Sequence, residues 1–274
     1  MGKFFDALSK SEKERKQTNE YEPISLNNEE PQEPDFVLSS EKQELDEKII
    51  TYHRPQTYDS EQFRVLKTGL FFSRKDNVPQ TIMITSAEPN DGKSFVAANL
   101  AVTVAKSVDS HVLLIDCDLR NPTVHKIFGL SGGEPGLSDL LSKKVDIKSP
   151  IYKTPVDKLT VLPAGNIPDN PTELLSSSRM VALIEEVKSR YSDRYIIIDS
   201  PPPLLAAETM AISSLVDGVI IVVRHEKTNR NTVKKVVNSF QKDKIVGLVL
   251  NQYDVRLDQY YGYGKYGAYY NQTS

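Results

Sequence analysis

From residue 81 onward, short apolar runs alternate with stretches whose apolar residues recur every three or four positions. The runs are rich in Val, Ile and Leu and are bounded by charged residues, which is typical of strands buried on both faces. Six runs follow this pattern, at 81–85, 111–115, 159–162, 195–198, 219–223 and 245–250, with helical stretches at 94–106, 171–191 and 228–241. The alternation predicts an α/β fold with a doubly wound, mostly parallel sheet and helices on both of its faces.

The composition excludes several classes of protein. Hydrophobic residues make up 39% and charged residues 26% of the 274 residues, as in ordinary globular proteins. The net charge of −3 is too close to zero for an electrostatic nucleic-acid binder, so no nucleic-acid partner is expected. The longest uncharged helix-like run, 94–105, is far shorter than the roughly 20 residues that cross a bilayer. With one cysteine and a charged N-terminus, the chain is expected to be cytoplasmic.

A phosphate-binding loop follows the first apolar run. Residues 87–94 read AEPNDGKS and match the pattern G-x-x-x-x-G-K-[ST], with Ala87 in place of the first glycine. Gly92 permits close approach of the backbone to a phosphate, Lys93 supplies a positive charge and Ser94 supplies a hydroxyl ligand for Mg²⁺. The residues predicted to bind the nucleotide are Ala87, Glu88, Pro89, Asn90, Asp91, Gly92, Lys93, Ser94 and Phe95.

Carboxylates stand at the ends of two further apolar runs. Asp116 and Asp118 follow the second run, and Asp199 follows the fourth. The carboxyl ends of parallel strands meet at one edge of a sheet, so these side chains are expected to face the phosphate-binding loop. Mg²⁺ prefers one or two carboxylates together with phosphate oxygens and water, which this set can supply. The alternative for each aspartate is that it caps the helix that follows.

Together these three segments resemble the Walker A, A′ and B motifs of the bacterial tyrosine kinases, P-loop enzymes of the deviant Walker branch that take part in capsule and exopolysaccharide assembly. The resemblance covers about residues 58–274 and includes further motifs at 121–128, 136–141 and 170–175. It implies an ATP-dependent protein-tyrosine kinase that uses Mg²⁺ as a cofactor.

The resemblance also implies roles for individual residues. Lys93 would contact the β- and γ-phosphates, Ser94 would bind Mg²⁺ directly, and Asp199 would reach the metal through water. Asp116 or Asp118 would orient or deprotonate the attacking phenol, and Asp116 is the preferred catalytic residue. The implied set is Asp116, Asp118 and Lys93 for catalysis, and Ser94, Asp116 and Asp199 for the metal. Asn251, at the end of the last run, is placed either to hydrogen-bond adenine or to cap its strand.

The segment SEQFRVLK at 60–67 is similar to the oligomerisation helix of the same family, whose pattern is E-x-x-R-x-x-R. A spacing of three places Glu61, Arg64 and Lys67 along one side of a helix, where they can pair with a neighbouring subunit. Lys67 replaces an arginine and cannot make its planar, bidentate contact. The alternative is a solvated helix face with ion pairs inside the helix.

Seven of the 13 tyrosines lie in the last 23 residues, which also hold three glycines. The glycines disfavour a stable helix, so 252–274 is predicted to be a flexible tail. By resemblance it is the kinase's own phosphorylation target, and the predicted acceptors are Tyr260, Tyr261, Tyr263, Tyr266, Tyr269 and Tyr270. An adhesive tail and a stacking surface for sugar or nucleic acid are alternatives. The nucleic-acid alternative is disfavoured because Arg256 and Lys265 are the tail's only basic residues.

The first 50 residues differ from the rest of the chain. They carry 13 acidic and 7 basic residues, a net charge of −6, whereas 51–274 carry a net charge of +3. Residues 19–40 are rich in Glu, Pro, Asn and Ser and show no apolar period. Phe4, Phe5 and Leu8 form a short apolar face, either in a frayed terminus or in a docking peptide. The predicted organisation is a disordered acidic segment at 1–50, a kinase domain at 51–251 and the tail at 252–274.

The resemblance implies partners as well. Phosphorylation is expected in trans within a homo-oligomeric ring, and added phosphates are expected to weaken that ring by charge repulsion. A separate membrane activator of the polysaccharide co-polymerase type would hold the chain at the inner membrane, and a tyrosine phosphatase would reverse the reaction. The main alternative is a partition or septum-placement ATPase, which carries a lysine at the position of Glu88. A non-catalytic nucleotide-binding scaffold is a second alternative.

Overall fold

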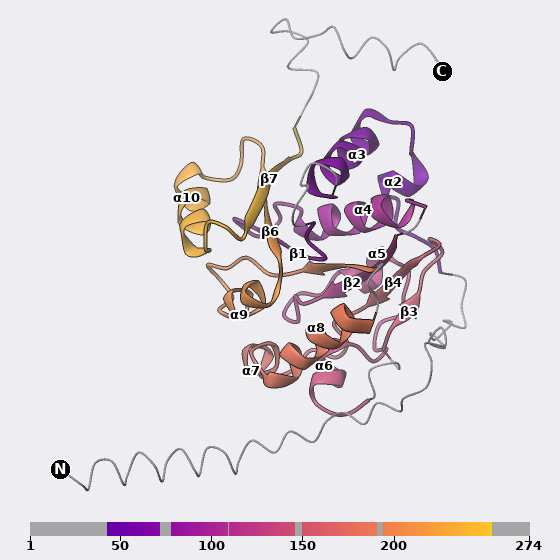
Figure 1. Cartoon of the computed structure of the whole chain (residues 1–274), viewed down its shortest axis with the longest axis vertical. Coiled ribbons are helices and arrows are strands. Elements are labelled where there is room, and N and C mark those ends of the chain that lie inside the picture. The colour runs from indigo at the N-terminus through magenta and orange to yellow at the C-terminus, as the bar shows by residue number, and fades with distance from the viewer. Residues whose placement is uncertain (1–42, 72–77, 109, 146–149, 191–193, 254–274) are drawn as a thin grey trace, which may run out of the picture. The chain divides into compact units, whose positions relative to one another are not determined.

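The computed structural model describes residues 43–71, 78–108, 110–145, 150–190 and 194–253. Within these residues, seven strands form one sheet in the order β3-β4-β2-β5-β1-β6-β7, and every neighbouring pair is parallel except β3 with β4 (Figure 1). The strands are β1 Thr81–Ser86, β2 His111–Asp116, β3 Tyr152–Lys153, β4 Leu159–Leu162, β5 Arg194–Asp199, β6 Gly218–Arg224 and β7 Ile245–Asn251. The predicted α/β class and mostly parallel sheet are confirmed.

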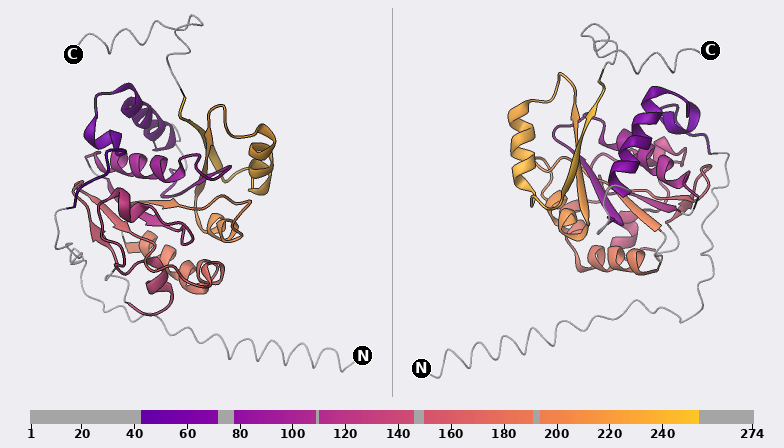
Figure 2. Two further views of the ribbon diagram at one scale, coloured as in Figure 1. Left: turned by 180° about the vertical axis from the view of Figure 1, so that it is seen from behind. Right: turned by 45° about the horizontal axis from the view of Figure 1, so that its top comes forward.

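Helices cover both faces of the sheet (Figure 2). One face packs against α2 Ile50–His53, α3 Tyr58–Phe71, α4 Lys93–Ala105 and α5 Val124–Ile127. The other face packs against α6 Leu137–Leu141, α7 Pro171–Leu175, α8 Ser178–Arg190, α9 Glu208–Leu215 and α10 Arg230–Ser239. The sheet is therefore doubly wound, and its two faces form two apolar clusters.

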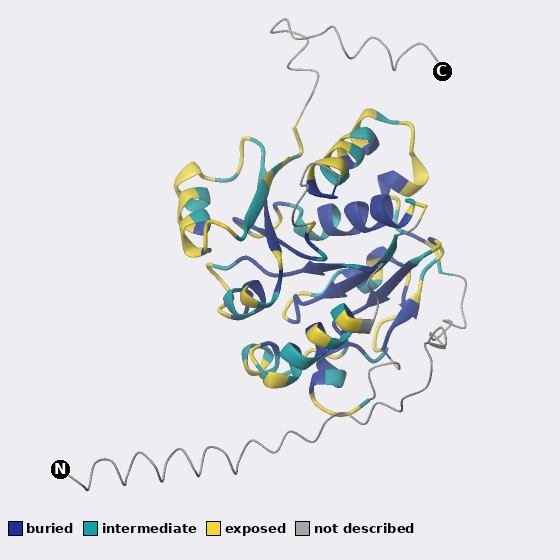
Figure 3. Cartoon of the chain, viewed as in Figure 1, coloured by how far each residue is buried: buried dark blue, intermediate teal, exposed yellow. Residues whose placement is uncertain are grey.

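The apolar runs became strands because both of their faces are covered. All six residues of β1 are buried, and the central strands form a continuous buried layer in Figure 3. Helix α4 lies directly on this layer, and every residue from Val96 to Ala105 is buried. Its many alanines and valines allow the helix to approach the sheet closely. This burial fixes the position of the loop that precedes α4.

Two sequence expectations need correction. Leu45 and Ile49 are 8% and 0% exposed and belong to the core, so the boundary predicted after residue 50 lies too late. The backbone N–H of Asp46 also donates to the carbonyl of Ile127 at 3.0 Å. The single helical stretch predicted at 171–191 is divided into α7 and α8. The short elements α2, α5, α6, α9 and β3 were not predicted.

Candidate active site

The phosphate-binding loop connects the centre of the sheet to the helix that covers it. β1 lies between β5 and β6 and ends at Ser86, and α4 begins at Lys93. Gly92 caps α4 with a φ of +96°, which L side chains rarely adopt. A Cβ on Gly92 would lie 2.0 Å from Nδ2 of Asn251, so any side chain here would displace that amide. Ala87 keeps a negative φ, and the first glycine of the pattern is therefore dispensable in this loop.

Three carboxylates and one ammonium group gather where β2 and β5 leave the sheet. Asp116 and Asp199 are register partners at the ends of these neighbouring strands, and both are fully buried. Nζ of Lys93 lies 2.8 Å from Oδ2 of Asp118 and 3.2 Å from Oγ of Ser94. The fold thus brings together the loop and the aspartates that the sequence separates.

Burial sets the electrostatics of this cluster. Burial alone would lower the pKa of Lys93, but the carboxylates of Asp199 and Asp118 outweigh it and raise that pKa above its usual value. Burial, followed by the charge of Asp199, raises the pKa of Asp116. Burial also raises the pKa of Asp199, although the Lys93 ammonium opposes the shift. Because Lys93 faces three carboxylates, a further cation would be stabilised here.

The carboxylate of Asp199 fits a metal ligand. Among the described residues, neither of its oxygens has a hydrogen-bond partner of ordinary length, although the Ser94 hydroxyl is near enough to favour its charged form. Burying an ionised carboxylate that lacks hydrogen-bond partners costs free energy unless a cation lies beside it. Within the residues that the structure describes, no group of three or more His, Cys, Asp or Glu side chains could hold a metal ion by itself. The residues present therefore fit Mg²⁺ bound together with phosphate oxygens and water.

Asp116 and Asp118 have different surroundings. The carboxylate of Asp116 accepts hydrogen bonds from the backbone N–H of Asp118 at 3.0 Å and from those of Thr123 and Val124 at 3.1 Å. The carboxylate of Asp118 accepts one from the N–H of Asn121 at 3.1 Å and pairs with Lys93. Asp118 lines the cavity described next, whereas Asp116 is sealed beneath it. Asp116 therefore fixes the local backbone, and Asp118 is the carboxylate that reaches the cavity.

A cavity of about 1240 Å³ lies over this end of the sheet. Its walls are the phosphate-binding loop, α3, the segment after β5 and the end of β7, contributing among others Lys93, Tyr58, Phe63, Pro201, Leu205, Asn251 and Tyr253. Ligand pockets usually measure about 300–1,000 Å³, so this cavity has room for more than one small ligand. A nucleotide and the ring of a second substrate could occupy it together.

The other predicted site residues take the following positions. Phe95 lines the cavity, and Nδ2 of Asn251 donates to the carbonyl of Asp91 at 2.8 Å, so this amide supports the loop. Glu61 and Arg64 pair with each other at 2.5 Å, as in the alternative of ion pairs inside the helix. Nζ of Lys67 donates to Ser107 at 3.1 Å. The six predicted acceptor tyrosines lie outside the described residues.

Sequence reasoning missed a polar cluster at the rim of the cavity. Nε of Arg120 lies 2.8 Å from Oε1 of Glu208, and its Nη2 donates to Thr172 at 3.1 Å. The Thr172 hydroxyl donates in turn to Oε2 of Glu208 at 2.9 Å. Burial would raise the pKa of Glu208, but the hydrogen bond from Arg120 outweighs it and lowers that pKa. The available signal in the sequence was one acidic residue, Glu208, within the mostly apolar stretch LLAAETMAI.

Comparison with known proteins identifies the family. A family model described as an AAA domain matches residues 80–246. The chain is 37% identical over 222 residues to tyrosine-protein kinase YwqD of Bacillus subtilis (strain 168), covering 80% of this chain and 91% of the relative. It is 35% identical over 221 residues to the putative tyrosine-protein kinase CapB of Staphylococcus aureus, covering 79% and 95%. The chain belongs to the bacterial tyrosine kinase family.

Solved structures agree with this assignment. The chimerical protein CapA2B2 matches the kinase with a TM-score of 0.70 and 34% identity, over 76% of this chain and 90% of the other. The cell division ATPase MinD of Pyrococcus furiosus has a TM-score of 0.53 at 24% identity, which shows a shared fold alone. The predicted P-loop NTPase fold is confirmed, and membership of this family implies nucleotide binding. Over the described ranges, the kinase has no helix with the length and apolar character of a membrane span.

Proposed function

We propose that this kinase transfers the γ-phosphoryl group of ATP to tyrosines in its own C-terminal segment, and that this reaction regulates capsule or exopolysaccharide synthesis and export. The observation that carries the proposal is the convergence of Lys93, Asp118 and Asp199 at one end of the sheet, beside a cavity large enough for two substrates. Gln252 and Tyr253 also line that cavity, so the segment that holds the proposed acceptors begins at the same cavity as Lys93 and Asp118.

The chain's own residues divide the work of phosphoryl transfer. Ser94 and Asp199 would hold Mg²⁺, which would neutralise charge on the transferred group, whereas both oxygens of Asp116, the third predicted ligand, already accept backbone hydrogen bonds. The backbone N–H groups at the start of α4 bind phosphate oxygens, helped by the partial positive charge of the helix N-terminus. Lys93 exchanges its contact with Asp118 for one with the phosphates, and this exchange leaves Oδ2 of Asp118 free to accept a proton.

Asp118 is the better candidate for the residue that orients or deprotonates the phenol. The sequence favoured Asp116, but both oxygens of Asp116 already accept hydrogen bonds from backbone N–H groups. A tyrosine has an ordinary pKa near 10, so its proton needs an acceptor within hydrogen-bond reach. Asp118 lines the cavity and can meet that requirement, and Asp116 then serves to hold the turn on which Asp118 stands.

Replacing the six predicted acceptor tyrosines by phenylalanine tests the proposed substrate. Incubation with Mg-ATP is expected to give phosphotyrosine in the wild type and none above background in this variant. Mg-ADP binding should stay within about twofold of the wild type, because the loop and the aspartates are unchanged. Mass spectrometry for phosphotyrosine and calorimetry for binding provide the two measurements. Undiminished phosphotyrosine in the variant would place the acceptors elsewhere in the chain.

The proposed reaction takes place between subunits, and mixing two inactive halves tests this. One chain carries Lys93→Met with an intact tail, and the other carries an intact site with the six tail tyrosines replaced by phenylalanine. Neither is expected to form phosphotyrosine alone, whereas the mixture labels the Lys93→Met chain. Absence of labelling in the mixture, together with normal labelling of the wild type, would indicate transfer within one chain. Such a result is physically accessible because Tyr253 lines the chain's own cavity.

We also propose a ring of subunits held through α3, a separate membrane activator of the polysaccharide co-polymerase type, and an opposing tyrosine phosphatase. The kinase would then be a cytoplasmic protein that its membrane activator holds at the inner membrane. Glu61 is 34% and Arg64 41% exposed at the side chain, so both remain accessible to a neighbour. The activator is tested by adding its cytoplasmic segment to the purified kinase and following the rate of phosphotyrosine formation.

The alternative of a partition or septum-placement ATPase has no specific support here. Oε1 of Glu88 accepts a hydrogen bond from the backbone N–H of Asn229 at 3.4 Å, next to the first residue of α10. A negative side chain is favoured at such a helix N-terminus, whereas the lysine of those ATPases would not be. Phosphate release without phosphotyrosine, on incubation with Mg-ATP, would reverse this preference.

A further inference from the structure

We propose that Asp91 and Thr228 form a latch that holds the phosphate-binding loop in its binding shape. Both are then positioning residues for the nucleotide, and neither needs to touch it. The inference rests on the proposed function, since it concerns the loop that would bind Mg-ATP.

Asp91 is only 2% exposed, although it occupies a variable position of the loop pattern. Its Oδ2 accepts a hydrogen bond from the N–H of Glu88 at 2.9 Å, which ties together the two ends of the loop's turn. Its Oδ1 accepts one from the Thr228 hydroxyl at 2.8 Å, and its backbone carbonyl accepts one from Asn251 at 2.8 Å. One residue thus connects the loop to itself, to the connection after β6 and to the end of β7.

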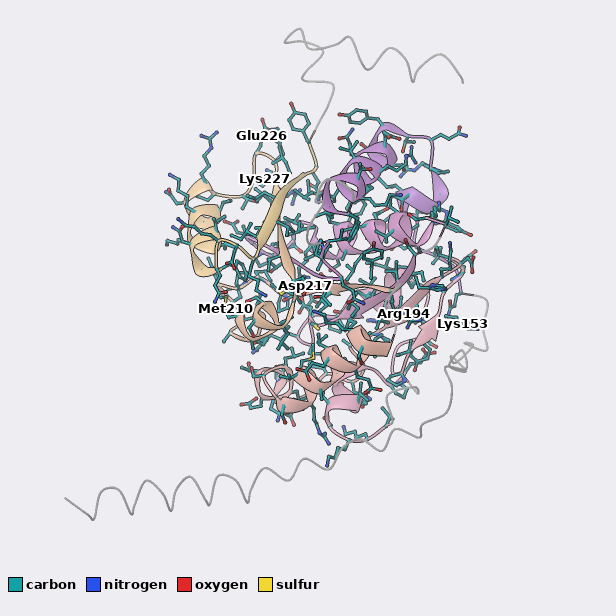
Figure 4. The ribbon with its side chains drawn as sticks, in the orientation of Figure 1. Lys153, Arg194, Met210, Asp217, Glu226 and Lys227 are labelled. Atoms are coloured by element: carbon teal, nitrogen blue, oxygen red, sulfur yellow. The ribbon has the colours of Figure 1, made fainter. Side chains whose placement is uncertain are left out.

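Thr228 belongs to the connection between β6 and α10. Its hydroxyl accepts a hydrogen bond from the backbone N–H of Arg224 at 2.9 Å and donates its single proton to Asp91. Figure 4 labels Glu226 and Lys227 of this connection near the end of β7, in agreement with the pairing of Arg224 with Asn251. The latch therefore joins the loop to a part of the sheet that is itself fixed by strand pairing.

The backbone of the loop explains why a latch is useful. Asn90 has a φ of +66° and Gly92 a φ of +96°, so Asp91 lies between two left-handed residues. Asparagine enters that region more readily than other non-glycine residues, but contacts around it must still select the left-handed conformation over the right-handed one. Hydrogen bonds that both carboxylate oxygens of Asp91 accept impose the conformation before a ligand arrives. The loop then binds its ligand more tightly, because the entropy cost of ordering the loop is not incurred during binding.

A purely structural role for the same hydrogen bonds makes a different prediction. If they only supported the β6–α10 connection, their loss would lower the melting temperature and leave nucleotide affinity unchanged. If the bonds form a latch, their loss also weakens nucleotide binding, because a loosened loop must become ordered when the phosphates bind. The decisive quantity is therefore the dissociation constant of Mg-ADP, compared with the melting temperature of the same variant.

The test measures Mg-ADP binding to the full chain by calorimetry in the wild type, Thr228→Val and Thr228→Ser. Thr228→Val keeps the shape but leaves Oδ1 of Asp91 without its donor, and we expect affinity to fall about tenfold. Thr228→Ser keeps the hydroxyl and should stay within about twofold of the wild type. The KM for ATP should rise with the dissociation constant in Thr228→Val, and kcat should fall less. Thr232→Val, within α10, is the matched control and should bind as the wild type does.

Wild-type affinity in Thr228→Val would overturn the latch, whatever its melting temperature, and so would a Thr228→Ser variant as weak as Thr228→Val. If Thr228→Val does not fold, Asp91→Ala replaces it. Alanine removes both carboxylate oxygens that accept hydrogen bonds from Glu88 and Thr228, so affinity equal to the wild type would again overturn the proposal. A wild type that does not bind Mg-ADP would contradict the proposed function itself, which is a distinct result.

Discussion

Replacing Asp118 by asparagine is expected to lower the rate of tyrosine phosphorylation about a thousandfold while Mg-ADP still binds. The variant loses the carboxylate that reaches the cavity, and a positioned general base contributes roughly 10²–10⁴-fold to rate. Binding should persist because Lys93 loses an internal competitor and remains available to the phosphates. Single-turnover labelling with radioactive ATP measures the rate, and calorimetry measures binding.

Asp116→Asn is the informative comparison for this variant. Its amide would set N–H groups against the backbone donors of Thr123 and Val124, and a lost buried hydrogen bond costs about 1–3 kcal/mol. We therefore expect a melting temperature lower by several degrees, at about 2–4 °C per kcal/mol for a domain of this size. An Asp118→Asn variant with near-normal rate, beside a stable but inactive Asp116→Asn variant, would return the catalytic role to Asp116.

Replacing Gly92 by alanine is expected to weaken Mg-ADP binding at least a hundredfold and to abolish detectable phosphotyrosine. The new Cβ would lie 2.0 Å from Nδ2 of Asn251, and a φ of +96° is strained for any L side chain. Either the Asn251 amide or the loop must move to relieve the collision, and each movement opens the hydrogen bond between Asn251 and Asp91. Calorimetry and phosphotyrosine detection provide the measurements.

Two controls separate the causes of this loss. Gly132→Ala meets no atom within 4 Å and should bind Mg-ADP normally. Adding Asn251→Ala to Gly92→Ala removes the collision but leaves the strained φ, so only part of the affinity should return. Normal binding by Gly92→Ala alone would show that the loop tolerates a shape other than the one described.

The sequence predicted the centre of the fold well and its margins poorly. Strands such as β1 and β5 are buried on both faces, and a continuous apolar run records that burial directly. β3 has two residues and α5 has four, which is too short for any period to be visible. The break between α7 and α8 falls at two serines, without the glycine or proline that usually marks a helix end. Leu45 and Ile49 were overlooked because they stand among charged residues.

The same distinction holds for the candidate site. Lys93, Asp116 and Asp199 follow apolar runs, and the geometry of a parallel sheet brings the ends of such runs together. The hydrogen bond between Asp91 and Thr228 joins residues 137 positions apart, and the sequence around each of them gives no indication of the other. The contrast between Asp116 and Asp118 was equally inaccessible, since it depends on which carboxylate the folded backbone covers.

The ion pair between Lys93 and Asp118 has a consequence for discrimination among cellular anions. An anion that approaches the resting loop competes with a carboxylate tethered 2.8 Å from the ammonium, at a very high effective concentration. Inorganic phosphate or a nucleoside monophosphate would offer the loop fewer contacts than a triphosphate and is expected to displace the carboxylate less readily. A chelated polyphosphate brings its own divalent counter-ion, so it can release the lysine and at the same moment neutralise the aspartates left behind. We expect this ion pair to favour a chelated polyphosphate over inorganic phosphate at the loop.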